Sequence, residues 1–350
     1  MDPREAAIRT AFAQQAVWCS QLGSPLTGAL CTILSEQLDR STATGRRILD
    51  WDGDPLADAL MLRPIGGLHA LVRSGQLPGL ATHYPPHQLP DMTILSAAVM
   101  AAIREADEAL LPWLASPPQT NEVARSGVLM PGLLVIADAT GLPLALHELG
   151  SSAGLNLRLD HYAYELGGLV IGPGLAPITL SPEWHGAPPP DARVRVTSRK
   201  GVDQNPLDIC DQQTRDRLLA YVWPDQPERL QRLESALTAA AMDPPVIDRA
   251  DAADWVEQQV WPAAGVVTVV FHSIAFQYFP MAARARIAAH MRRVGQEATV
   301  DAPVAWLRFE LDDPEQIGPP PTLRLQIWPG GEDRLLARVH PHGALVHWLG

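Results

Sequence analysis

The sequence predicts an α/β protein in which an all-α N-terminal domain precedes a mostly parallel sheet with a terminal antiparallel hairpin. Residues 1–130 place apolar side chains at helical spacing and contain no convincing strand with period-2 alternation. Gly265–Phe271 is a continuous β-branched run, typical of a parallel strand covered on both faces. Thr322–Trp328 and Leu335–Val339 flank Pro329–Glu332, a pattern typical of a hairpin.

Two domains follow from these patterns. We expect a helical cap domain over residues 1–125 and the α/β domain over residues 126–350, with a hairpin insertion near 166–190. The cap domain is predicted to contain helices over Leu26–Leu38, Leu56–Arg73 and Met92–Leu114. The α/β domain is predicted to contain strands over Leu142–Leu149 and Val304–Leu311, and a helix over Asp251–Val260 that Asp251 caps.

Composition excludes several classes of function. The chain of 350 residues has a formal net charge of -12, which argues against a nucleic-acid or anionic-membrane partner. Lys200 is its single lysine and lies in Ser198–Gly201, where the order of residues excludes a P-loop. The N-terminal residues lack an apolar segment typical of a signal peptide, so we expect a cytoplasmic protein.

The segment Leu144–Asn156 carries the most chemical information. A predicted strand ends in Glu148, and Gly150-Ser-Ser-Ala-Gly154 follows, a small-residue loop that is predicted to open a helix. Small residues let a backbone approach a ligand, and a helix N-terminus offers free N–H groups. In open α/β sheets the ligand crevice lies at the carboxyl ends of the strands. The segment therefore predicts a site for a nucleotide-like ligand.

Three motifs compete for this loop. The dinucleotide motif G-x-G-x-x-G fails, because Ser152 and Leu155 replace its second and third glycines. The esterase motif G-x-S-x-G fits with Ser152 as the nucleophile. A catalytic triad would then use Asp248 or Asp251 together with His340 or His342. The third possibility is an E-x-G-x-x-x-G cofactor loop.

That third possibility has support from a wider resemblance. Residues from about 131 to 350 resemble class I S-adenosylmethionine-dependent methyltransferases in the order of their parts, with Ser152 in place of the middle glycine. The resemblance implies a Rossmann-like sheet in which Glu148 faces the methionine ammonium group and the backbone of Gly150 and Gly154 lines the cofactor. It also implies that Asp203 holds the ribose hydroxyls and Asp251 the adenine amino group. Ser152 and Asn156 complete the expected cofactor-binding set.

The whole chain more closely resembles an uncharacterised bacterial family catalogued as a domain of unknown function. The resemblance lies in motifs that occur in the same order, namely Gln119–Val123 with Arg125-Ser126, Glu148–Leu157, Asn205–Asp208, Tyr221–Asp225 and His340–Gly343. It implies no reaction.

Two further features concern substrate. Asn121, Glu122 and Arg125 could bind a carboxylate, or could form a capped helix start with an ion pair. His272 ends the most apolar strand and could remove a proton during methyl transfer, or could be a structural histidine. His340 and His342 lack a carboxylate at ligand spacing, so no metal is expected.

The sequence therefore predicts methyl transfer from S-adenosylmethionine to an unknown small molecule. Two alternatives remain: a serine hydrolase that uses Ser152, and a non-catalytic binding protein on a degenerate methyltransferase fold.

Overall fold

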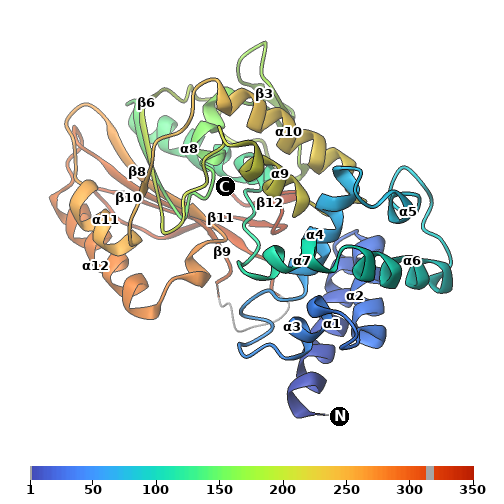
Figure 1. The fold of residues 1–350 in the computed structure, drawn as a ribbon. Coiled ribbons are helices and arrows are strands. Elements are labelled where there is room, and N and C mark those ends of the chain that lie inside the picture. The colour runs from blue at the N-terminus through green and yellow to red at the C-terminus, as the bar shows by residue number, and fades with distance from the viewer. Residues whose placement is uncertain (1, 313–318) are drawn as a thin grey trace. The chain divides into compact units, whose positions relative to one another are not determined.

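The computed structural model describes residues 2–312 and 319–350 (Figure 1). The chain forms two compact units. The first comprises residues up to Thr120 together with Asp211–Glu234, and the second comprises Asn121–Cys210 together with Ser235–Gly350. The first unit therefore includes a segment from the middle of the sequence.

The described part of the first unit is helical. Proline begins several of its helices, because its fixed φ angle suits the first helical position. Leu30, Leu68 and Leu95 from three of the helices are fully buried in one shared core. The helices are α1 (Pro3–Gln21), α2 (Pro25–Gln37), α3 (Ala43–Leu49), α4 (Leu62–Arg73), α5 (Pro78–Ala81), α6 (Met92–Glu105), α7 (Asp107–Leu114), α9 (Gln212–Ala220) and the first part of α10 (Pro227–Ala241).

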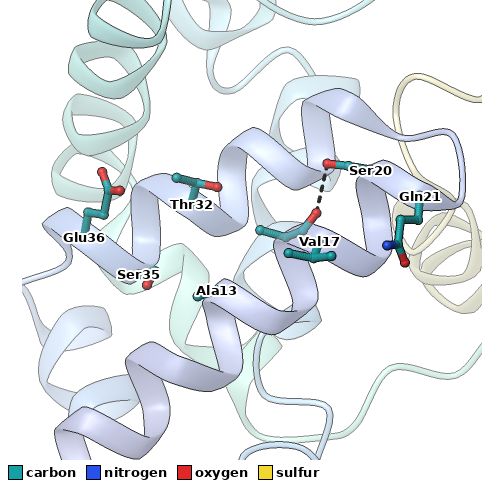
Figure 2. A pocket seen from close by; sticks show the side chains of 8 residues that line it. Ala13, Val17, Ser20, Gln21, Thr32, Ser35 and Glu36 are labelled. Carbon is teal, nitrogen blue, oxygen red and sulfur yellow. Dashed lines mark hydrogen bonds between the residues drawn. The ribbon is translucent and has the colours of Figure 1, made fainter. Parts of the chain in front are cut away.

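An open groove of about 370 Å³ lies along α1 and α2 in this unit (Figure 2). Its lining combines small apolar and polar side chains: Ala13, Ala16, Val17, Ser20, Gln21, Thr32, Ser35 and Glu36. The Ser20 hydroxyl donates a hydrogen bond to the Ala16 carbonyl oxygen on the same helix. None of the predicted site residues lines this groove.

The second unit is built on a nine-stranded, mostly parallel sheet, so the chain has an α/β fold. The strand order is β5-β12-β11-β10-β9-β8-β1-β6-β7. The strands are β1 (Leu144–Leu149), β5 (Glu183–His185), β6 (Val196–Asp203), β7 (Ile247–Arg249), β8 (Val267–Ser273), β9 (Val304–Glu310), β10 (Thr322–Trp328), β11 (Arg334–Val339) and β12 (Leu345–Trp348).

The parallel part of the sheet has a reversal of strand order at its centre. Strands β7, β6, β1, β8 and β9 are mutually parallel, and numbered along the chain they lie in the order 3-2-1-4-5. The order reverses between β1 and β8, and in open α/β sheets ligands bind beyond the carboxyl ends of the strands at such a point. Glu148 pairs there with Gly201 on β6 and with Phe271 on β8.

Helices cover both faces of the sheet. On one face α8 (Ser126–Thr140) packs closely, since a Cβ atom at Gly132 would lie 2.4 Å from the Leu307 side chain. On the other face α11 (Ala252–Gln259) and α12 (Met281–Glu297) share a core with Val270 and Trp306, and Figure 1 shows these two helices side by side. Leu307 and Trp306 are consecutive, and successive strand residues point to opposite faces.

One helical stretch, Val123–Thr140, is the candidate membrane span among the described residues by length and composition. In the structure 78% of it is buried inside the protein. That burial is what a core helix of a globular fold requires.

A small second sheet lies between β1 and β6 in the sequence. It has the order β3-β2-β4 and follows the 3-10 helix η2 (Asn156–His161). Its strands are β2 (Ala163–Leu166), β3 (Leu169–Ile171) and β4 (Thr179–Leu180). The connection from β1 to β6 therefore contains this sheet and no α-helix.

The strongest strand patterns correspond to observed strands. The predicted Gly265–Phe271 is β8, and the predicted Thr322–Trp328 is β10 with the same bounds. Asp251 caps α11 as predicted, because its Oδ1 accepts from the N–H groups of Ala253 and Asp254. Beyond the β10–β11 hairpin two further strands, β12 and β5, extend the sheet. Both are short, so neither shows a periodic pattern in the sequence.

We predict that Leu307→Ala lowers the free energy of unfolding by about 2–5 kcal/mol, because it leaves a cavity beneath α8. Leu307 is fully buried on β9. The matched control Leu175→Ala removes a fully exposed side chain and should change the value by less than about 0.5 kcal/mol. Chemical denaturation measures both, and equal effects would contradict the described packing.

Candidate functional site

The loop of residues 150–155, here called the β1–η2 loop, has an unusual backbone. Gly150, Ser152 and Gly154 all have positive φ angles, of 70°, 52° and 71°. Ser152 therefore adopts a left-handed conformation that costs a non-glycine residue roughly 1–2 kcal/mol. Such a conformation persists only where the surrounding structure holds it.

Packing explains both glycines. A Cβ atom at Gly150 would lie 2.7 Å from the Ala275 side chain, and one at Gly154 would lie 2.6 Å from the Pro245 ring. Any side chain at either position would therefore collide with a neighbour. The glycines allow close approach of the segments after β8 and before β7.

Hydrogen bonds attach the loop to the end of β6. The Val202 carbonyl oxygen accepts from the N–H groups of Gly150 at 2.9 Å and Ser151 at 3.1 Å. The Ser152 N–H donates to Asp203 Oδ2 at 2.8 Å. The loop and the Asp203 carboxylate are thus held together beyond the carboxyl ends of two adjacent strands.

Beyond the loop, side chains bind the backbone of Leu155. Its N–H donates to Asn121 Oδ1, and its carbonyl oxygen accepts from the Tyr162 hydroxyl. The Ser126 hydroxyl donates to Asn156 Oδ1. The predicted helix with free N–H groups is wrong, because η2 is a 3-10 helix of six residues. The segment is also kinked at Arg158, whose backbone is non-helical.

Glu148 is the most unusual group at the site. Glu148 is only 2% exposed, and its Oε2 atom has no hydrogen-bond partner among the described residues. Burial raises the pKa of Glu148 well above its ordinary value of 4.5, and the Asp203 carboxylate raises it further. The Arg125 guanidinium and the Leu157 N–H lower this pKa. Burial is the largest of these effects, so the net shift of the Glu148 pKa is upward.

The two other predicted acids have different environments. Asp203 accepts from Ser152 N–H through Oδ2 and from Asn205 N–H through Oδ1, so both oxygens bind backbone. A carboxylate oxygen can accept more than one hydrogen bond, so this arrangement leaves capacity for ligand hydroxyls. Asp251 caps α11 and lies just after β7, whose Arg249 pairs with Asp203 on β6.

The three residues predicted to bind a carboxylate all contact backbone. Asn121 accepts from Leu155, and Glu122 Oε1 accepts from the Ala124 N–H. Arg125 donates to the carbonyl oxygens of Ser273 at 3.0 Å and Pro341 at 3.2 Å. Glu122 caps the 3-10 helix Val123–Arg125, which fits the capped helix start of the alternative prediction. The carboxylate-binding role stays a prediction.

His272 lies on a different face of the sheet from Glu148 and is fully buried. Trp306 Nε1–H donates to His272 Nε2 at 3.1 Å, so the ring proton is on Nδ1 and is directed to Glu310 Oε1 at 2.7 Å. Both ring nitrogens are therefore engaged within the protein. This geometry favours the structural alternative over the base predicted for methyl transfer.

The hydrolase alternative requires a base beside Ser152. The Ser152 hydroxyl is buried and has no hydrogen-bond partner among the described residues, so no histidine activates it in this conformation. Asp248, a candidate triad acid, accepts from Trp255 Nε1–H at 2.7 Å and pairs with Lys200 at 3.2 Å. His340 Nδ1 accepts from the His342 N–H within one turn.

Among the residues that the structure describes, no group of three or more His, Cys, Asp or Glu side chains is placed to hold a metal ion.

Two residues that hold the site were not predicted from the sequence. Tyr162 fixes the carbonyl of Leu155, and Glu310 fixes the turn after β8. Glu310 ends strand β9, next to the end of β8, so the rule that acids at strand ends gather at one edge could have identified it. Tyr162 follows η2 and carries no comparable signal.

We predict that Gly154→Ala lowers the free energy of unfolding by about 2–5 kcal/mol, from left-handed strain plus collision with Pro245. Gly141 is the matched control, because its φ of 66° is similar but no atom lies within 4 Å of its added Cβ. Gly141→Ala should cost only about 1–2 kcal/mol. Denaturant titration compares the two, and equal losses would exclude a tight contact at Gly154.

We also predict that Glu148→Gln changes the dependence of stability on pH. A carboxyl whose folded pKa is raised stabilises the fold below its unfolded pKa, and this contribution is lost as pH rises towards the folded pKa. Glutamine cannot ionise and does not lose this contribution. The Tm of the variant relative to that of the wild type should therefore be a few degrees higher at about pH 8 than at about pH 5.

Thermal unfolding at the two pH values provides the measurement. Glu183→Gln is the control, because the Glu183 side chain is 69% exposed and its pair with His185 lies far along the chain from the loop. Parallel pH profiles for wild type and Glu148→Gln would contradict the raised pKa.

Comparison with known proteins places the chain in one family. No curated protein and no solved structure matches it. The family model described as "Uncharacterized protein conserved in bacteria (DUF2332)" matches residues 9–348, which is nearly the whole chain. The protein therefore belongs to this uncharacterised bacterial family.

Proposed function

We propose that the protein is a cytoplasmic methyltransferase that binds S-adenosylmethionine at the β1–η2 loop and acts on a small molecule. The main observation in support is that Glu148 is buried and that one of its carboxyl oxygens lacks a hydrogen-bond partner among the described residues. An unsatisfied buried polar group costs roughly 1–3 kcal/mol, so a ligand that donates a hydrogen bond there gains free energy. The best donor to a carboxylate is a cation.

An ammonium group fits this requirement. A positive charge beside Glu148 favours the ionised carboxylate, which opposes the effect of burial. The methionine part of S-adenosylmethionine carries such a group. Its ribose hydroxyls suit Asp203, which the Ser152 N–H holds next to the same loop. Asp251 remains the proposed partner of the adenine amino group.

The topology supports a nucleoside-containing ligand of this kind. Strand order 3-2-1-4-5 is that of doubly wound Rossmann-like sheets, in which the ligand lies beyond the carboxyl end of the first strand. Here that strand is β1, and it ends next to Glu148. The two glycines let the chain turn sharply there.

S-adenosylmethionine supplies an electrophilic methyl group when bound. The residues of this chain are proposed to orient it: Glu148 through the ammonium group and Asp203 through the ribose. Orientation is the main requirement of methyl transfer, because nucleophile, methyl carbon and sulfur must lie in line.

Calorimetric titration with S-adenosylmethionine and S-adenosylhomocysteine tests this proposal. We expect binding to the wild type, about tenfold or greater weakening in Glu148→Ala from loss of a charged hydrogen bond, and a smaller loss in Asp251→Ala. Glu183→Gln is the control and should bind as the wild type does. Absence of binding at millimolar ligand would refute the proposal. Binding without methyl transfer would favour the non-catalytic alternative.

A further inference from the structure

The turn after β8 is held in a strained conformation. Ile274 has a φ of 49°, a left-handed value that is a genuine outlier for a β-branched residue. Its own N–H donates to the Phe309 carbonyl oxygen at the end of β9. Residues 274–276, here called the β8 turn, therefore need support from elsewhere in the fold.

Glu310 supplies that support. Its Oε1 accepts from the N–H groups of Ala275 and Phe276, both at 3.1 Å, and from His272 Nδ1 at 2.7 Å. Trp306 fixes the tautomer of His272 that makes this donation possible. One carboxylate oxygen thus binds three donors, two of which belong to the β8 turn.

The β8 turn contacts the β1–η2 loop directly. Ala275 occupies the space where a Cβ of Gly150 would lie, and the Phe279 ring is next to the same point. Arg125 holds the preceding Ser273 carbonyl oxygen from another side. Glu310 therefore holds the turn that packs against Gly150, and Gly150 lies two residues after Glu148.

We propose that Glu310 is a positioning residue, which holds the β8 turn against Gly150 and so keeps the β1–η2 loop in its ligand-binding form. His272 serves the same purpose through its hydrogen bond to Glu310. The identity of the ligand in this inference rests on the proposed function; the support of the turn does not.

Two substitutions at Glu310 separate hydrogen bonding from packing. Glu310→Gln keeps a carbonyl oxygen that can accept from the turn, whereas Glu310→Leu has similar size and accepts nothing. Hydrogen exchange of the full-length, ligand-free protein is measured at Ala275 and Phe276 and over residues 150–155. We expect exchange about tenfold or more faster in Glu310→Leu, and within about threefold of the wild type in Glu310→Gln.

Glu183→Leu is the matched control, since Glu183 also binds a histidine, His185, at 2.9 Å but on strand β5. It should leave exchange in both segments unchanged. If Glu310→Leu fails to fold, Glu310→Asp replaces it, because a carboxylate one methylene shorter cannot reach all three donors. It should also accelerate exchange at the same amides. Unchanged exchange at Ala275 and Phe276 in the folded variant would overturn the proposal.

Ile274→Gly gives a second, opposite prediction. Glycine adopts positive φ without strain, so adding Ile274→Gly to Glu310→Leu should restore part of the lost protection over residues 150–155, where the amides of Gly150, Ser151 and Ser152 have acceptors other than Glu310. Exchange as fast as in Glu310→Leu alone would contradict strain at this turn.

Titration with S-adenosylhomocysteine supplies the link to binding. Affinity should fall about tenfold or more in Glu310→Leu and stay within about threefold in Glu310→Gln. A wild type that fails to bind would refute the proposed function, while the exchange data would still decide the role of Glu310. Normal affinity in a Glu310→Leu variant with a mobile turn would overturn the link to the loop.

Discussion

The two hydrogen bonds accepted by the carbonyl oxygen of Val202 are the interaction on which the rest of the site depends. This oxygen accepts from the N–H groups of Gly150 and Ser151 and so turns the chain immediately after β1. This turn leaves Glu148 in sheet register between β6 and β8, where it is buried. It also brings the Ser152 N–H to Asp203. A buried carboxyl group at the end of β1 and a second acid at the end of β6 therefore both lie beside one short loop, whose start is fixed by one backbone acceptor.

Support for this loop comes from segments that are distant in the sequence. Pro245 fills the space beside Gly154, and Ala275 fills the space beside Gly150. The left-handed backbone at Ser152 and Ile274 persists because these neighbours and Glu310 restrict the alternatives. Residues that are not proposed to touch a ligand thus hold the loop in place, as a preorganised site requires.

Local patterns predicted much of the fold. Continuous β-branched residues identified β8, and the Pro-Gly-Gly turn identified the β10–β11 hairpin. The short strands β5 and β12 and the 3-10 form of η2 were not predicted, because pairing with distant strands and packing of the insertion decide them. Of the acids predicted to bind a cofactor, Glu148 and Asp203 lie beside the same loop, although their roles stay predictions. The sequence did not identify Glu310, whose role depends on the register of β8 and β9.

The sequence by itself determined an α/β chain with an acid and small residues at the end of one strand, because these features are local and periodic. Only the tertiary structure decided that Glu148 is buried with one oxygen that has no hydrogen-bond partner among the described residues. It also decided that the ring nitrogens of His272 bind Trp306 and Glu310. Burial and hydrogen-bond partners arise when parallel pairing brings separate strands to a common edge. The chemical state of an ionisable side chain follows from those neighbours rather than from its place in the chain.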